Sequence, residues 1–344
     1  MRIGLVGTGR IGAFHASTLA GLDQVDEVVL TDAVPGAAET LAAEHGYGTA
    51  PDVDTLLGQV DGVVITTPTT THAALLRQTV AAGLPTFCEK PVAMTLDESI
   101  ELVDLVESST VPVQIGFQRR FDTGYRRARD AVRSGDLGFV HTLRANTHDQ
   151  APPPAAYIPT SGGLFRDCSI HDFDIIRFVT GREVLSVYGV GANKGDDFFT
   201  EGGDVDTCAA VLTLDDDTVV TVSATRYNGA GHDVRLEVMG SAGTVGVGFD
   251  DSLAVRSAED GVDYPRGPQK WSFMERFQPA YRRELGVFAD LVAGRVSSPC
   301  TVRDGLQAFR IAEACELSRR RRARVDLAEI PDDSGTTGAG ARSA

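Results

Sequence analysis

A short segment in the middle of the chain combines two carboxylates and an imidazole at helical spacing. Asp167, His171 and Asp174 fall on one face of a helix at roughly 100° per residue. Most other residues of 162–179 are apolar, which predicts a buried helix with a narrow polar stripe. Buried carboxylates and imidazoles are unfavourable unless they have partners. The stripe therefore indicates either a polar cavity suited to proton transfer or a core histidine that Asp167 merely satisfies.

The N-terminus carries the pattern of a phosphate-binding loop. An apolar strand, 2–6, runs into Gly-x-Gly-x-x-Gly, and a helical pattern follows. In this context the first glycine allows a tight turn, the second lets a pyrophosphate approach, and the third lets the helix pack on the strand. The helix N-terminus offers N–H donors to the phosphates. The alternative is a purely structural glycine turn. We expect the cofactor to contact Gly7, Gly9, Arg10, Ile11 and Gly12.

An acidic residue follows the second predicted strand. This strand, 27–31, ends in Asp32, twenty positions after Gly12. A carboxylate at this place in a dinucleotide-binding fold bonds the ribose hydroxyls of the adenosine. Ala33 and Val34 follow it, so neither an arginine nor a serine is there to receive a 2′-phosphate. The pattern therefore favours NAD over NADP.

Strands and helices continue to alternate up to about residue 120, which predicts an α/β domain with a doubly wound parallel sheet over 1–120. Ligands of such sheets bind outside the carboxyl ends of the strands. Pro91 should end one strand and leave the Lys90 ammonium at the mouth of the nucleotide crevice, unless that ammonium is only a solvated charge. Further cofactor contacts are expected after two strands, at Thr67, Pro68, His72, Glu89 and Lys90.

The second part of the chain has a different pattern. Turn residues separate strand-like segments at 184–190, 206–214, 219–226, 232–239, 244–249 and 252–256. Successive strands joined by hairpins indicate a large, mostly antiparallel sheet. Helices are expected over 276–291 and 303–321. We therefore predict an α+β domain over 121–330, followed by a Gly/Ser/Thr-rich disordered tail, 331–344.

Length and composition exclude several classes of protein. The chain has 344 residues, too many for one ordinary hydrophobic core, so two domains are expected. No apolar run is long enough to cross a bilayer, and the N-terminus does not resemble a signal peptide. Five cysteines without paired spacing predict buried thiols of a reduced cytoplasmic protein, with no metal site. The net charge of −16 argues against nucleic-acid and anionic-membrane partners.

Taken together, these motifs resemble the family of glucose–fructose oxidoreductase, inositol dehydrogenase and their relatives (the Gfo/Idh/MocA family). The resemblance covers the chain from its start to about residue 330. It rests on the glycine loop, on Glu89-Lys90-Pro91 and on Asp167-x-x-x-His171. The stretches 116–122 and 149–157 make it strongest with the inositol 2-dehydrogenases.

The resemblance implies oxidation of a secondary alcohol on a ring polyol by NAD, and here most closely the conversion of myo-inositol to its 2-ketone. It implies that Lys90, Asp167 and His171 form the catalytic set, with His171 as proton acceptor. A histidine titrates near neutral pH and suits this role. It further implies a homotetramer built on the antiparallel sheet. The same three residues would also contact substrate, together with Arg119, Asp149, Asp174 and His232.

Other functions are compatible with the same residues. The same chemistry could act on scyllo-inositol, another cyclitol or an aldose such as glucose. In this chain His232 stands where the relatives more often have tyrosine. Two alternatives of another class are a non-redox ligand sensor and a glycosidase of this fold that uses NAD transiently. A pure sensor would not need Lys90, Asp167 and His171 together.

Overall fold

The computed structural model describes residues 1–333, and the chain forms two compact units. The first comprises Met1–Gln118, Pro279–Gln307 and the described residues 332–333, and the second comprises Arg119–Gln278 and Ala308–Pro331. The predicted disordered tail, 331–344, falls from residue 334 onward outside the described residues. No helix within 1–333 combines the length and the apolar character needed to span a membrane.

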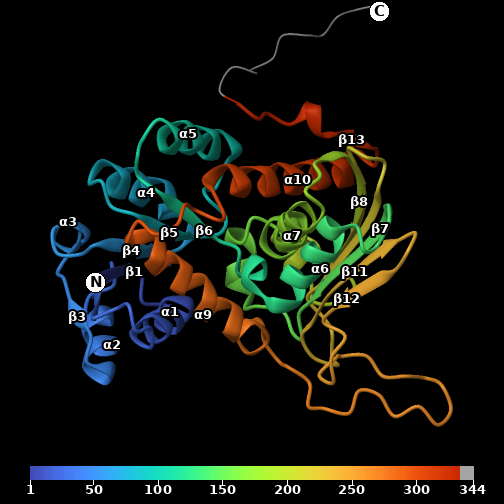
Figure 1. Ribbon diagram of the computed structural model, residues 1–344, viewed down its shortest axis with the longest axis horizontal. Coiled ribbons are helices and arrows are strands. Elements are labelled where there is room, and N and C mark those ends of the chain that lie inside the picture. Colours follow the sequence, from blue (N-terminus) through green and yellow to red (C-terminus); the bar gives the residue numbers. More distant parts are fainter. Residues whose placement is uncertain (334–344) are drawn as a thin grey trace, which may run out of the picture. The chain divides into compact units, whose positions relative to one another are not determined.

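The first unit contains a sheet of six strands, and the predicted parallel arrangement is confirmed (Figure 1). Its strand order is β3-β2-β1-β4-β5-β6, so the order reverses between β1 and β4. The open ends at such a reversal are where doubly wound sheets bind their ligands. The strands are β1 (Arg2–Val6), β2 (Glu27–Thr31), β3 (Gly48–Thr49), β4 (Gly62–Ile65), β5 (Thr86–Glu89) and β6 (Val113–Gly116).

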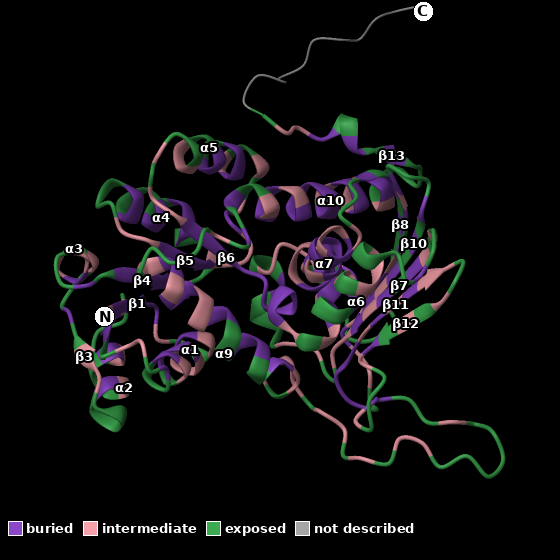
Figure 2. Cartoon of the chain, viewed as in Figure 1, coloured by how far each residue is buried: buried purple, intermediate pink, exposed green. Residues whose placement is uncertain are grey.

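Helices alternate with these strands and bury a shared apolar core. Ile3, Leu5 and Leu30 of the sheet are fully buried, as are Leu285 and Phe288 of the segment 279–307. Figure 2 shows that β1 and β4 are largely buried. Parallel strands that are covered on both faces have nearly continuous apolar sequences, which is why these strands can be predicted from the sequence. The helices that alternate with the strands are α1 (Arg10–Ala20), α2 (Ala37–His45), α3 (Val53–Leu57), α4 (His72–Ala81) and α5 (Leu96–Glu107).

The second unit contains a seven-stranded sheet in the order β12-β11-β7-β10-β9-β8-β13. All neighbouring strands are antiparallel except β7 and β10, which are parallel, so the prediction of a mostly antiparallel sheet is confirmed. The strands are β7 (Val140–His148), β8 (Val184–Ala192), β9 (Thr207–Leu214), β10 (Val219–Thr225), β11 (Asp233–Gly240), β12 (Thr244–Val247) and β13 (Val325–Asp326).

Two helices of this unit, α6 (Thr123–Ser134) and α7 (Ile170–Thr180), pack against each other, and α7 also contacts β7. A short helix, α8 (Phe198–Glu201), lies between β8 and β9 in the chain. Two long helices, α9 (Phe273–Val292) and α10 (Val302–Arg321), contribute residues to both units. Both correspond to helices expected from the sequence.

Two local predictions are wrong. The segment 252–256 is not a strand, because Asp250 accepts a hydrogen bond from the Ser252 N–H at 2.9 Å and turns the chain there. The segment Phe165–Ser169 is π-helical and only Ile170–Thr180 is α-helical. A π-helical turn contains more residues than an α-helical turn. The constant angular step assumed for 162–179 therefore does not hold across Asp167.

Two buried ion pairs connect α7 to the segment that precedes α6. Arg119 Nη1 lies 2.5 Å from Asp172 Oδ1, and Thr147 Oγ1 donates to Asp172 Oδ2 at 2.8 Å. Arg120 holds both oxygens of Asp174, with distances from 2.6 to 3.1 Å. Asp172 and Asp174 are both 0% exposed. Burial raises the pKa of Asp172, and the nearby Arg119 opposes this rise.

Asp174→Asn is expected to lower the free energy of unfolding by about 3 kcal/mol or more, because Arg120 remains charged and buried without this carboxylate. Urea unfolding of both proteins measures the difference. Glu183→Gln is the matched control, because it removes the carboxylate that pairs with Arg177 from a side chain that is 56% exposed. Its loss should stay below about 1 kcal/mol. Equal small losses in the two variants would contradict the structural role of Asp174.

Candidate active site

The glycine loop of the first unit has the geometry of a phosphate cradle. Gly7 has φ +96°, which favours glycine. A Cβ on Gly12 would lie 1.9 Å from the Gly7 carbonyl oxygen, whereas a Cβ on Gly9 would meet nothing within 4 Å. Helix α1 begins at Arg10, and no side chain caps its N-terminus. The loop therefore leaves open space beside helix N–H groups, which fits the diphosphate of a dinucleotide.

Asp32 is fixed beside this loop at the end of β2. Its Oδ2 accepts hydrogen bonds from Thr8 N at 2.5 Å and Thr8 Oγ1 at 2.8 Å, and its Oδ1 accepts from Val34 N at 2.8 Å. Burial raises the pKa of Asp32, but the hydrogen bonds from Thr8, Val34 and Ala33 outweigh it, and the net shift is downward. Asp32 therefore presents an ionised carboxylate where a ribose is expected.

Hydrogen bonds connect the neighbouring strand ends of the first unit. Thr66 Oγ1, directly after β4, donates to the Gly7 carbonyl oxygen at 2.7 Å. The predicted cofactor contacts Thr67 and Pro68 follow Thr66, and Glu89 and Lys90 end the adjacent strand or follow it. His72 is only 1% exposed, and its two ring nitrogens face backbone carbonyls. The structure thus gathers these residues at one edge of the sheet, but it buries the His72 ring.

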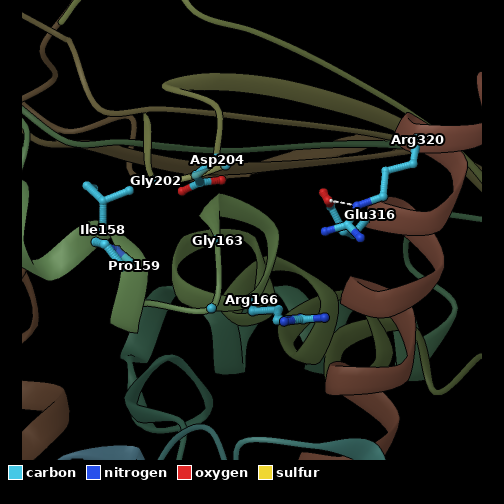
Figure 3. A pocket seen from close by; sticks show the side chains of 10 residues that line it. Ile158, Pro159, Gly163, Arg166, Gly202, Asp204, Glu316 and Arg320 are labelled. Atoms are coloured by element: carbon cyan, nitrogen blue, oxygen red, sulfur yellow. Dashed lines mark hydrogen bonds and ion pairs between the residues drawn. The ribbon is translucent and has the colours of Figure 1, made fainter. Parts of the chain in front are cut away.

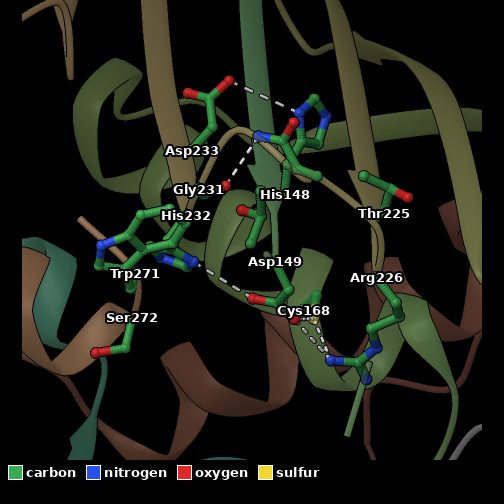
Figure 4. A network of polar contacts seen from close by, with 12 residues as sticks. His148, Asp149, Cys168, Thr225, Arg226, Gly231, His232, Asp233, Trp271 and Ser272 are labelled. Carbon is green, nitrogen blue, oxygen red and sulfur yellow. Dashed lines mark hydrogen bonds and ion pairs between the residues drawn. The ribbon is translucent and has the colours of Figure 1, made fainter. Parts of the chain in front are cut away.

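In the second unit, a buried arginine joins two of the predicted substrate-site carboxylates. Arg226 Nη2 donates to Asp167 Oδ2 at 2.5 Å, and Arg226 Nη1 donates to Asp149 Oδ2 at 3.0 Å. Tyr157 donates to the other oxygen of Asp167 at 3.1 Å. His232 Nδ1 lies 3.4 Å from Asp149 Oδ1. Figure 4 shows His232 and Arg226 reaching Asp149 from two sides.

In this cluster the arginine and the carboxylates stabilise one another in their charged forms. Burial opposes the charge of Arg226, but Cys168, Asp167 and Asp149 outweigh it, and the pKa of Arg226 lies well above its usual value. Burial raises the pKa of Asp149, but bonds and charges from His232 and Arg226 bring the net pKa below the ordinary value. Asp149 is therefore ionised at neutral pH, and paired with Arg226 it is a poor proton acceptor.

The imidazole of His171 is the remaining acid–base group of the segment. His171 is the second residue of α7 and is half-buried, so it is partly accessible. It follows Asp167 by four positions across the junction of the π-helical and α-helical turns. Histidine side chains commonly serve as general bases, so the partly accessible His171 is the candidate proton acceptor of the segment.

The remaining predicted substrate contacts lie elsewhere in the second unit. Arg119 and Asp174 belong to the two buried ion pairs described above, with exposures of 2% and 0%. No local sequence pattern marks Arg226 or Tyr157 as site residues. Arg226 is the last residue of the predicted strand 219–226. Its partners Asp167 and Asp149 are 59 and 77 positions away in the sequence, and no local pattern predicts these contacts.

A hollow of about 170 Å³ lies beside the turn that precedes the π-helical segment (Figure 3). Its lining includes Gly163, Arg166, Asp204, Glu316 and Arg320. Asp204 Oδ1 accepts a hydrogen bond from Leu164 N at 3.0 Å. Asp204 thus anchors the start of the segment that carries Asp167, and none of the predicted site residues lines this hollow. Within 1–333 no three His, Cys, Asp or Glu residues are arranged to hold a metal ion.

Comparison with known proteins matches both parts of the chain to domains of one family. Residues 1–117 match the model of the oxidoreductase family with an NAD-binding Rossmann fold, and residues 125–246 match the GFO/IDH/MocA C-terminal domain. The chain is 39% identical to the myo-inositol dehydrogenase Hyg17 of Streptomyces leeuwenhoekii, over 92% of this chain and 97% of that protein. It is 33% identical to the inositol 2-dehydrogenase of Rhizobium meliloti, over 95% and 99%.

Solved structures agree with these relatives. The crystal structure of a myo-inositol dehydrogenase from Corynebacterium glutamicum superposes with a TM-score of 0.86 at 31% identity, covering 95% of this chain and 98% of that one. Scyllo-inositol dehydrogenase from Lactobacillus casei, with bound NAD(H) and scyllo-inositol, gives 0.86 at 28% identity, covering 95% and 99%. The resemblance expected from the motifs is confirmed, and the chain belongs to the GFO/IDH/MocA family of oxidoreductases with an NAD-binding Rossmann fold.

Proposed function

We propose that this protein oxidises myo-inositol with NAD to the 2-ketone. The observation that carries the proposal is the arrangement of Asp167, in which Arg226 and Tyr157 fix the carboxylate four positions before a half-buried His171. The relatives named myo-inositol and inositol 2-dehydrogenase support myo-inositol as substrate. A relative 35% identical and named scyllo-inositol 2-dehydrogenase (NAD(+)) makes scyllo-inositol the second candidate.

The residues of the chain take distinct roles in this reaction. His171 accepts the proton of the substrate hydroxyl, and Asp167 orients the imidazole. The ammonium of Lys90 stabilises the negative charge that develops on the oxygen. Asp149 and His232 bind ring hydroxyls, which can each donate and accept a hydrogen bond. When bound, NAD supplies the acceptor for the hydride that leaves the carbinol carbon.

In this proposal Arg119 and Asp174 act indirectly, by holding α7 in place. Their ion pairs with Asp172 and Arg120 fix α7 and thereby the backbone of His171. We also place the protein in the cytoplasm. The five cysteines support this, because they are all buried free thiols and a reducing compartment preserves such thiols.

Wild-type protein should form NADH, followed at 340 nm, with myo-inositol as its best substrate in a panel that includes scyllo-inositol, other cyclitols and glucose. His171→Ala should lower kcat by about 10²- to 10⁴-fold, because the positioned base is lost. His45→Ala is the control, since His45 is an exposed residue of α2 in the first unit. A near-wild-type kcat in folded His171→Ala protein would contradict the role of His171, and no NADH with any polyol would contradict the proposed function.

Replacement of Asp32 should weaken the preference for NAD. Repulsion between this carboxylate and a 2′-phosphate is on the order of 1–4 kcal/mol at close approach. Asp32→Ala should therefore lower the ratio of kcat/KM for NAD to kcat/KM for NADP by at least about tenfold. The exposed Asp23 provides the control variant Asp23→Ala. An unchanged ratio in Asp32→Ala would show that another residue selects the cofactor.

We further propose that the protein is a homotetramer that uses the outer face of the seven-stranded sheet. Apolar side chains on this face are 44–50% exposed, and Tyr188 of β8 pairs in register with Val211 of β9. Contiguous exposed apolar patches of this kind are typical of protein interfaces. The exposed apolar residues of the face are Leu185, Tyr188, Val190, Val211 and Val219.

Light scattering should give four times the mass of one chain for the wild-type protein and a smaller assembly for Val211→Lys, because the variant places a charge in the interface. Val34→Lys is the control, since Val34 is a 64% exposed residue of the first unit. A wild-type monomer at micromolar concentration would overturn the proposal.

A further inference from the structure

Two buried histidines of the first unit hold the residues on either side of Lys90. His15 Nε2 lies 2.6 Å from Oε1 of Glu89, the residue before Lys90. His72 Nδ1 lies 2.8 Å from the carbonyl oxygen of Pro91, the residue after it. His15 is 0% exposed and His72 is 1% exposed. The imidazoles are therefore placed to anchor the chain at Lys90, and burial keeps them from contacting a cofactor directly.

His72 connects two strand ends. Its second ring nitrogen, Nε2, lies 2.9 Å from the carbonyl oxygen of Thr67, in the loop after β4. Carbonyl oxygens only accept hydrogen bonds, so each ring nitrogen meets an acceptor. Burial lowers the pKa of His72, and the two carbonyls and Glu89 oppose this shift. A neutral imidazole has one N–H, so it donates to one of the two carbonyls at a time, and the ring lies between the segment after β5 and the loop after β4, two strands that are neighbours in the sheet.

His15 anchors the other side of Lys90 to the helix that follows the glycine loop. It lies on α1, and its ring contacts Phe14, Phe87 and Tyr281 with centroid distances of 5.5–5.9 Å. Its Nδ1 is buried and has no hydrogen-bond partner among residues 1–333. The tautomer that carries its proton on Nε2 is favoured, because that nitrogen alone has an acceptor, Glu89. The glycine loop, α1 and the end of β5 are therefore fixed to one another.

We propose that His72 is a positioning residue for Lys90, with His15 as its counterpart on the other side. The catalytic consequence rests on the proposed function, in which the Lys90 ammonium meets the developing oxyanion. Strand β5 ends at Glu89, which pairs with Gly116, so the sheet ladder does not extend to Lys90 and Pro91. Catalysis is sensitive to small errors of position, since a misplacement of about 1 Å can reduce the rate by about 10²-fold.

Lysine NMR tests the proposal without reference to activity. The chain contains three lysines, Lys90, Lys194 and Lys270, so reductive ¹³C-methylation gives few signals and provides two internal references. His72→Phe keeps a ring and removes both nitrogens. It should shift or broaden the dimethyl signal of Lys90 and leave the signals of Lys194 and Lys270 in place. His72→Gln, which retains a donor, should return the Lys90 signal toward its wild-type position.

The control variant is His45→Phe, which changes an exposed histidine of α2 in the same unit. It should leave all three lysine signals unchanged. If His72→Phe does not fold, His72→Leu is compared with His45→Leu by the same signals. A Lys90 signal identical in wild-type, His72→Phe and His72→Gln protein would overturn the proposal.

Kinetics then show whether the effect on Lys90 matters for the reaction. His72→Phe should lower kcat by about 10- to 10²-fold. In a Lys90→Ala background it should have little further effect, because His72 acts through Lys90. A full additional loss in that background would overturn the positioning role. If the Lys90 signal moves as expected but no polyol is oxidised by wild-type protein, the proposed function fails and the positioning of Lys90 stands.

Discussion

The second unit depends on one interaction, the contact of the buried Arg226 guanidinium with Asp167 and Asp149. These carboxylates come from the π-helical segment and from the residue after β7, which no ladder hydrogen bonds connect. Charges in a protein interior are tolerated when they are paired with good geometry. Arg226 therefore explains how two acidic residues from different segments of the chain can lie close together.

In the first unit, buried polar contacts likewise fix the loops of the proposed cofactor site. Asp32 accepts bonds from the backbone and side chain of Thr8, and Thr66 bonds the carbonyl of Gly7. Together with His15 and His72, these contacts fix every loop that leaves the neighbouring strands β1, β2, β4 and β5. A cofactor site made of loops can be rigid because buried polar groups hold the loops together.

Local sequence patterns were sufficient to predict the parallel sheet and its glycine loop. The glycine loop, Asp32 and the alternation of apolar strands with helices are short-range signals, and the parallel sheet follows from them. Periodicity also placed α9 and α10. It failed at Phe165–Ser169, because a π-helical turn leaves no mark in the spacing of apolar residues. Periodicity also could not show that Asp167 pairs with Arg226 and Asp174 with Arg120, because both arginines are distant in the sequence.

In the proposed reaction, the hydride passes from a ring carbon of a cyclitol to NAD. The most direct measurement uses myo-inositol that carries deuterium at C2 and NMR of the reduced cofactor. Transfer of one deuterium to the nicotinamide ring, together with a primary isotope effect when hydride transfer limits the rate, is the predicted result. Reduced cofactor without deuterium, or product formation with no reduction of NAD, would contradict the account.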